Sequence, residues 1–109
     1  MKLEMDPDDF RTVRRILAQW IPECDVYVFG SRAGGTARKK SDLDLAVMTR
    51  KQLDSSRRAD LKDAFAESVL PFKVDIVDWA ETKENFRKLI RERRVRIQKG
   101  VRKVSRSKF

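Results

Sequence analysis

The 109-residue sequence contains no histidine and only one cysteine, Cys24. The lack of histidine excludes Cys–His metal sites and Ser–His or Cys–His catalysis, and a single cysteine cannot form an internal disulfide. No apolar run approaches the roughly 20 residues needed to span a bilayer, and residues 1–6 lack the apolar stretch of a secretory signal. We therefore expect a cytoplasmic protein with no membrane partner. Any catalysis must depend on carboxylates, hydroxyls, lysine, arginine or a bound cation.

Acidic residues are the minority charge, with 17 Asp and Glu against 26 Lys and Arg and a net charge of +9. This balance favours a polyanionic partner, such as a nucleotide, a nucleic acid or an acidic protein. The basic residues concentrate between Arg87 and Lys108, where Glu92 is the only acid. A solvated helix face and a frayed tail explain this segment most simply. Docking of a protein partner is the next interpretation, and nucleic-acid binding is not favoured.

Hydrophobic spacing and turn residues predict the order helix, strand, loop, strand, helix, strand, helix. The first helix is expected to begin with Asp6 as N-cap and Pro7 at its first position. Its inward-facing residues are Phe10, Val13, Leu17 and Trp20. Cys24, close to the start of the next strand, is expected to be a small core residue. Strands are predicted at 25–29, 42–47 and 72–77, and the segment 31–41 is a loop or a short helical turn.

The remaining helices are predicted from their caps and apolar spacing. One is capped by Ser55 or Ser56 and carries Leu61, Ala64, Phe65 and Val69 inward. The last follows Asp78 as its cap, ends at Gly100 and carries Phe86, Leu89, Ile90, Arg93 and Ile97. The pattern predicts an α+β (α/β-like) fold, with helices packed on a short sheet. Residues 1–100 form the domain, and 101–109 are a basic tail that is either a short strand or disordered.

Two aspartates lie two residues apart on the second predicted strand, so Asp42 and Asp44 emerge on the same face. Leu43, Leu45 and Val47 occupy the opposite face and can pack against helices. Two parallel carboxylates repel each other unless a cation lies between them, and ligation by oxygen alone favours magnesium or manganese. An edge strand with a solvated polar face is the alternative interpretation of this pair.

A glycine and a serine, Gly30 and Ser31, directly follow the first predicted strand. At such a turn, backbone N–H groups and a hydroxyl can approach a phosphate closely. Gly34 and Gly35 let the loop fold near a ligand, and Arg32 and Arg38 add positive charge. Taken alone, a glycine and serine at a strand end are more often a simple turn.

The combination is more specific than its parts. Gly30-Ser31, ten intervening residues and Asp42-x-Asp44 resemble the signature of the DNA polymerase β-like nucleotidyltransferase superfamily. The longer run 28–45 resembles its minimal nucleotidyltransferase branch, and the similarity extends from about Phe10 to Arg94. Gly34 and Lys39 depart from the pattern, because relatives often carry arginine and proline there. Both departures lie in the loop and leave the carboxylates intact.

The resemblance implies a polymerase β-type fold with a short mixed sheet flanked by helices, and a third carboxylate on a later strand. Two residues qualify for that role. Asp75 lies between apolar neighbours and shares the parity of a polar strand face, whereas Asp78 has the opposite parity and fits a helix cap. We therefore favour Asp75.

The resemblance also implies a mechanism. Asp42, Asp44 and Asp75 would hold two magnesium ions, with manganese as a substitute. The triphosphate of an ATP substrate would be held by Gly30 and Ser31, with Arg32, Arg38 and Ser41 as further phosphate contacts. Members of this branch are often antitoxins that transfer AMP to a tyrosine of a HEPN-family ribonuclease toxin, which implies such a partner here.

The rival function is a non-catalytic module that binds a toxin or a nucleic acid through the basic C-terminal segment and retains a vestigial site. A degenerate member is expected to lose a carboxylate first. Every signature position here is filled by a competent residue, which favours an enzyme.

Overall fold

A computed structural model of the chain describes residues 3–38 and 40–101. Its helices are α1 (Pro7–Trp20), α2 (Ser31–Gly34), α3 (Ser55–Ala66), the 3-10 helix η1 (Trp79–Glu81) and α4 (Glu84–Glu92). Its strands are β1 (Asp25–Phe29), β2 (Leu43–Met48), β3 (Val74–Asp78) and β4 (Arg94–Gln98). They form one sheet in the order β3-β2-β1-β4, in which β2 and β3 are parallel and β1 is antiparallel to both β2 and β4. The predicted α+β fold with a short mixed sheet is confirmed.

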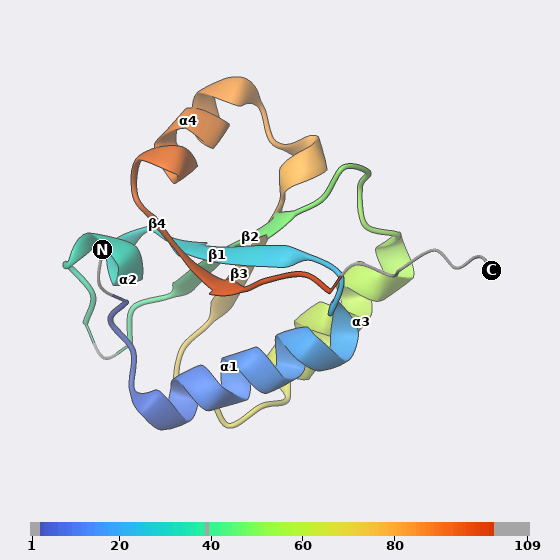
Figure 1. The fold of residues 1–109 in the computed structure, drawn as a ribbon. Helices are drawn as coiled ribbons and strands as arrows, with labels where there is room; N and C mark the ends of the chain where they lie inside the picture. Colours follow the sequence, from blue (N-terminus) through green and yellow to red (C-terminus); the bar gives the residue numbers. More distant parts are fainter. Residues whose placement is uncertain (1–2, 39, 102–109) are drawn as a thin grey trace.

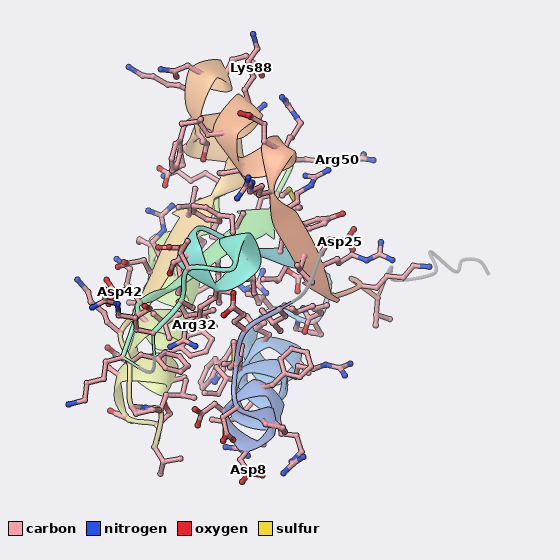
Figure 2. All side chains as sticks on the ribbon, turned by 90° about the vertical axis from the view of Figure 1, so that its left-hand side faces the viewer. Asp8, Asp25, Arg32, Asp42, Arg50 and Lys88 are labelled. Atoms are coloured by element: carbon pink, nitrogen blue, oxygen red, sulfur yellow. The ribbon has the colours of Figure 1, made fainter. Side chains whose placement is uncertain are left out.

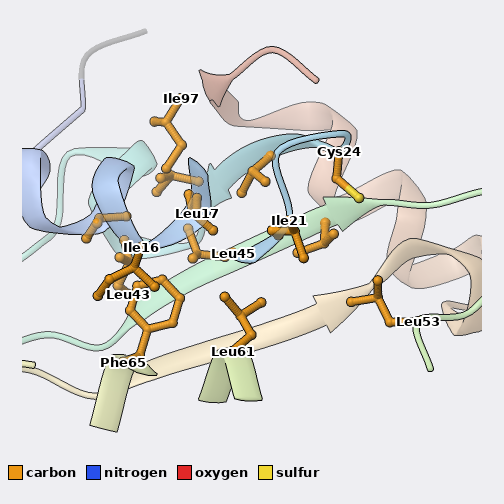
Figure 3. Close-up of a cluster of buried hydrophobic side chains, with 14 of the residues drawn as sticks. Ile16, Leu17, Ile21, Cys24, Leu43, Leu45, Leu53, Leu61, Phe65 and Ile97 are labelled. Carbon is orange, nitrogen blue, oxygen red and sulfur yellow. The ribbon is translucent and has the colours of Figure 1, made fainter. Parts of the chain in front are cut away.

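The sheet has helices on both faces (Figure 1). The helices α1 and α3 lie along one face, and α4 lies over the other. The core fills the space between the sheet and the α1–α3 layer (Figure 3). It is built from side chains that alternate along the strands, including the fully buried Val26, Val28, Leu43, Leu45 and Val47. None of the helices in the described part of the chain combines the length and apolarity that crossing a membrane requires.

The first helix begins as predicted. The side chain of Asp6 accepts a hydrogen bond from the backbone N–H of Asp8, and Pro7 is the first helical residue. Val13 and Leu17 are fully buried. The prediction for Trp20 is wrong, because its side chain is 36% exposed and Ile21, immediately after the helix, is fully buried and closes that end of the core. Cys24 is buried, as predicted.

The second long helix differs from its prediction at both ends. The N-cap is Asp54, whose carboxylate accepts from the N–H of Ser56, and not Ser55 or Ser56 itself. The helix ends at Ala66, where the backbone and hydroxyl of Ser68 bond to the carbonyl of Phe65. Val69 therefore lies beyond the helix and is 86% exposed, so its inward placement was wrong.

The largest error lies in the C-terminal helix, which was predicted to run from Asp78 to Gly100. Asp78 does act as a cap, but of the short η1, and α4 begins only at Glu84 and ends at Glu92. Residues 94–98 instead form β4, which pairs with the free edge of β1. Their strict alternation of polar and apolar residues also fits a strand, and backbone pairing with β1 outweighs the helical spacing.

The end of β4 is attached to the start of β1. The Gln98 amide donates to the carbonyls of Ile21 and Cys24, and the N–H of Gly100 donates to the Asp25 carboxylate at 2.6 Å. Of the predicted basic tail, residues 102–109 lie outside the described part of the chain.

Candidate active site

One residue from each strand lies on a single rung of the sheet. Asp44 of β2 is paired with Asp75 of β3 on one side and with Phe29 of β1 on the other, and Phe29 is paired with Arg94 of β4. Paired residues in a sheet project to the same face, so these four side chains share the face that α4 overlies. The strand-parity argument for Asp75 is thus matched by a register that places it directly beside Asp44.

Gly30 follows Phe29 and lies against the Asp44 carboxylate. Its φ angle is 76°, which places it in the left-handed region that favours glycine. A Cβ atom at this position would be 2.3 Å from Oδ2 of Asp44, closer than any non-bonded contact allows. Only glycine therefore lets the strand-ending turn and the Asp44 carboxylate occupy adjacent space. Ser31, partly buried, then opens the short helix α2.

The surroundings of Asp44 destabilise the ionised form of its carboxyl group. Burial is the main cause that raises the pKa of its carboxyl group, and the negative charges of Asp75 and then Asp42 raise it further. The strand β2 begins at Leu43, one residue later than predicted, so Asp42 lies immediately before it. The side chain of Asp42 is exposed. Asp75 is half-exposed, with the ammonium of Lys73 3.8 Å from its carboxylate. The Asp44 carboxylate therefore lies within the electrostatic influence of two other carboxylates.

This donor set fits a hard divalent cation. Within residues 3–38 and 40–101, no three or more His, Cys, Asp and Glu side chains are already arranged as a metal site. The Asp44 and Asp75 carboxylates are nonetheless register neighbours, and Asp42 raises the pKa of Asp44 by its charge. Oxygen-only ligands suit magnesium or manganese, and a cation among them would relieve the repulsion that raises the pKa of Asp44.

Arg32 lies beneath the loop that joins Gly30 to Asp42 (Figure 2). The residue is 4% exposed, and its guanidinium donates to the carbonyls of Ser41, Glu4 and Arg38. It also lies over the ring of Phe72, 4.2 Å from the centroid. These groups hold the Arg32 side chain inside the fold, where it supports the loop. Its phosphate contact stays a prediction.

The other two loop residues with predicted phosphate contacts lie at the turn before β2. The Ser41 hydroxyl accepts a hydrogen bond from the N–H of Arg38 at 2.7 Å, which closes this turn. The Arg38 side chain is exposed. Their phosphate contacts stay predictions.

Asp78, the rejected alternative to Asp75, is buried on the opposite face of the sheet. Its carboxylate accepts hydrogen bonds from the Thr49 hydroxyl, the N–H groups of Leu53 and Ala80, and the Arg58 guanidinium. Burial alone would raise the pKa of Asp78, but these hydrogen bonds outweigh it and hold the pKa below its usual value. Asp78 therefore joins β3, α3 and the β2–α3 connection.

Asp78→Asn and Asp75→Asn are expected to separate stability from activity. Asp78→Asn should lower the free energy of unfolding by about 1–3 kcal/mol, because several buried donors lose their charged acceptor. The folded-state pKa of Asp78 is depressed, so its contribution is present above the unfolded-state pKa and is lost as the pH falls through the folded-state value. Denaturant unfolding from neutral to acidic pH should show the wild-type and Asp78→Asn curves converging in acid. Asp75→Asn should keep its stability and lose the nucleotidyl transfer that the resemblance implies; the reverse pattern would contradict the choice of Asp75.

A cavity of about 500 Å³ opens beside the Gly30–Ser31 turn. Its walls come from the end of β1, from α2 and the residues just after it, from α4, and from Arg93. Phe29 and Phe86 are both part of this wall, and their rings meet edge to face with centroids 5.9 Å apart. The sequence offered one signal for this wall, the apolar spacing of Phe86 and Leu89, but that spacing was interpreted as core packing. A larger cavity of about 990 Å³, near Cys24 and Met48, lies at the other end of β1 and β2 and includes none of Asp42, Asp44 and Asp75.

Comparison with known proteins identifies the family. Residues 23–99, more than two thirds of the chain, match the family model described as polymerase beta, nucleotidyltransferase. The chain belongs to this family. It is a nucleotidyltransferase, and the resemblance indicated by the spacing from Gly30 to Asp44 is confirmed.

Individual relatives are similar over much of the chain. A probable protein adenylyltransferase, MntA of Haemophilus influenzae, is 45% identical over 103 residues, which cover 94% of this chain and 90% of that protein. The protein adenylyltransferase MntA of Shewanella oneidensis is 38% identical over 65 residues, 59% of this chain and 46% of that protein. A crystal structure of a toxin–antitoxin with AMP-PNP superposes with a TM-score of 0.69 at 28% identity, covering 84% of this chain and 73% of that one.

Proposed function

We propose that this nucleotidyltransferase transfers AMP from ATP to a hydroxyl group of a partner protein and thereby acts as an antitoxin. The observation that carries the catalytic part is the rung that places Asp75 beside Asp44, with Gly30 in contact with the Asp44 carboxylate. The protein acceptor is supported by the 45% identity with a probable protein adenylyltransferase over almost the whole chain. We assign catalysis to residues 1–100 and treat 101–109 as an appended basic tail.

In this proposal the chain positions the nucleotide and the acceptor for in-line displacement. Gly30 and Ser31 bind the triphosphate through backbone N–H groups and a hydroxyl. Asp42, Asp44 and Asp75 would hold two magnesium ions, which would supply positive charge to the triphosphate and to the reacting phosphorus. The acceptor oxygen bonds to the α-phosphorus as the bond to the pyrophosphate oxygen breaks, and Asp75 is the group proposed to take the proton of the acceptor hydroxyl.

The acceptor is proposed to be a tyrosine of a HEPN-family toxin, which is the partner implied by the minimal nucleotidyltransferase branch. The similarity to a toxin–antitoxin structure with AMP-PNP at 28% identity supports a toxin partner and an adenine nucleotide. Attachment of AMP to that tyrosine would inactivate the toxin.

Label transfer from ATP tests this proposal. With magnesium and the protein encoded beside this gene, ATP labelled at the α-phosphate should give a labelled acceptor protein, whereas ATP labelled at the γ-phosphate should give none. Mass spectrometry should locate one added AMP on a tyrosine hydroxyl. Label from the γ-phosphate would identify a phosphotransferase, and label on nucleic acid alone would contradict the protein acceptor.

A further inference from the structure

A basic surface is formed by segments that are far apart in the chain, and it is called the basic face below. Its cations are Arg50 and Lys51 in the connection between β2 and α3, Arg87 and Arg91 on α4, and Arg94 and Arg96 on β4. Figure 2 shows Arg50 and Asp42 on opposite sides of the molecule. The basic face therefore extends away from the carboxylates of the candidate active site.

Trp79 connects the cations of α4 with those that follow β2. It lines the cavity of about 990 Å³ together with Arg50 and Lys51. The guanidinium groups of Arg87 and Arg91 lie over the Trp79 ring, 4.8 and 5.4 Å from its centroid. One aromatic side chain thus has cations from both segments around it.

Tyr27 connects the cations of β4 to the same surface. The Arg94 guanidinium lies over the Tyr27 ring, 4.3 Å from the centroid, and Arg96 is the register partner of Tyr27. Two residues earlier on β1, and so on the same face of the sheet, Asp25 is paired with Met48. Both of these residues line the cavity of about 990 Å³. The cations of β4 and those around the cavity therefore border one continuous surface.

Much of this positive charge is not neutralised within the protein. In the part of the chain that the structure describes, no ion pair is formed by Arg50, Lys51, Arg94 or Arg96. The acids beside them have other partners, since Glu84 is paired with Arg91 and Asp25 accepts from the N–H of Gly100. The aromatic rings also hold the guanidinium groups above them in place, so less side-chain freedom is lost when these groups bind an anion.

The composition of the basic face favours nucleic acid over an acidic protein. Protein interfaces depend on buried aromatic and apolar anchors, whereas nucleic-acid interfaces are more polar and much more positively charged. On α4, the exposed apolar side chains Phe86 and Leu89 line the cavity beside Gly30 instead. Guanidinium groups lie over the rings of Tyr27 and Trp79, so contact with phosphates is expected and not stacking of bases.

We propose that the basic face binds the phosphate backbone of a nucleic acid without reading its bases. Along the chain, the basic residues between 87 and 99 form one run, which also fits a solvated helix. The fold divides this run between α4 and β4 and adds the cations of residues 50–51. Cations gathered onto one surface produce a stronger local potential than the same charges spread along a solvated helix. Such binding does not depend on the proposed transfer of AMP.

Salt-dependent binding tests this proposal on the full chain. The probe is a fluorescein-labelled oligouridylate of about 20 nucleotides, and its fluorescence anisotropy gives the affinity from about 50 to 200 mM KCl. The wild type should bind with a Kd of about 10⁻⁴ to 10⁻⁶ M near physiological salt, and the affinity should fall steeply as salt is added. Arg50→Gln/Arg96→Gln should bind about tenfold or more weakly at low salt. The slope of log affinity against log salt should fall by about 1.4, or about 0.7 for each lost contact with a single strand.

The matched control is Arg15→Gln/Lys62→Gln. It removes the same charge from exposed positions on α1 and α3, the helices that cover the other face of the sheet. Its affinity should stay within about twofold of the wild type, because its charges lie outside the basic face. Arg50 and Arg96 are exposed as well, so both double variants should unfold at the temperature of the wild type.

Three outcomes would overturn the proposal. Equal losses in the two double variants would mean that net charge alone attracts the probe. Equally tight binding of a labelled polyglutamate of the same length, weakened in the same variant, would identify an acidic protein as the partner. A wild type that leaves the oligouridylate unbound at about 50 mM KCl would show that the basic face is only a solvated surface. Each outcome leaves the proposed AMP transfer standing, because none of the substituted residues belongs to the candidate active site.

Discussion

Asp44→Asn is expected to abolish nucleotidyl transfer without destabilising the protein. The change removes one charged oxygen ligand from the centre of the rung, where the reacting phosphorus is proposed to lie. Loss of a single electrostatic contact to a transition state costs roughly a hundredfold to a thousandfold in rate, and loss of a metal ligand should cost at least that much. The measurement is the initial rate of AMP transfer from ATP labelled at the α-phosphate.

The stability of Asp44→Asn follows from the sign of its pKa shift. Burial and the charges of Asp75 and Asp42 raise the folded-state pKa of Asp44, so the ionised group opposes folding at neutral pH. That opposition is relieved as the pH falls through the folded-state value, and a neutral asparagine relieves it at every pH. Without magnesium, the variant should therefore unfold at a temperature equal to or above that of the wild type. Magnesium should stabilise the wild type and have little effect on the variant.

The matched control is Asp60→Asn, which removes one carboxylate from the exposed surface of α3. Its transfer rate and its response to magnesium should equal those of the wild type. Retention of transfer within about tenfold in Asp44→Asn, well short of the loss expected for a metal ligand, would refute the assignment of Asp44 to the reacting centre.

Gly30→Ala is expected to lose both stability and activity. The substitution carries two separate energetic costs, backbone strain and steric overlap. An L residue at a φ of 76° is strained by roughly 1–2 kcal/mol, and its Cβ would lie 2.3 Å from Oδ2 of Asp44. Relief of that overlap requires the Asp44 carboxylate or the turn itself to move, and a displacement of about 1 Å in a reacting group can cost a hundredfold in rate.

Gly35→Ala separates the two costs. Gly35 has a φ of 81°, but its added Cβ would lie 3.6 Å from the nearest atom, Oε2 of Glu4, which is an ordinary contact. Thermal unfolding should show a small loss for Gly35→Ala and a larger one for Gly30→Ala, and only the latter should lose transfer. The additional loss of thermal stability in Gly30→Ala should disappear when it is combined with Asp44→Ala, because the Oδ2 atom that the added Cβ would overlap is then absent. Equal effects of the two single substitutions would mean that backbone strain alone explains Gly30.

The Gly30–Ser31 turn and the carboxylates depend on one feature of the sheet, the register of β1 with β2. That register places Phe29 and Gly30 beside Asp44, and the parallel pairing of β3 places Asp75 on the other side. A shift by one residue would turn Asp44 into the core and Leu45 outward. The buried alternation of Leu43, Leu45 and Val47 therefore holds the reacting centre in place as well as stabilising the fold.

The sequence by itself determined the features that depend on near neighbours along the chain. The helix start at Asp6 and Pro7 and the inward alternation of β2 follow from caps and periodicity, which act within a few residues. The same parity separated Asp75 from Asp78, and the structure places them on opposite faces. The spacing from Gly30 to Asp44 identified the family before any fold was known.

Only the tertiary structure decided what depends on distant partners. Residues 94–98 fit both a helix and a strand locally, and the free edge of β1 made them a strand. Arg32 carries a charge suited to phosphate, yet its guanidinium donates hydrogen bonds to the carbonyls of residues 4, 38 and 41, which hold it inside the fold. The sequence showed that Phe86 and Leu89 share one face of a helix, but the placement of that face beside Gly30 depends on how α4 crosses the sheet. Such placements result from backbone pairing and packing between segments far apart in the chain, which no local pattern contains.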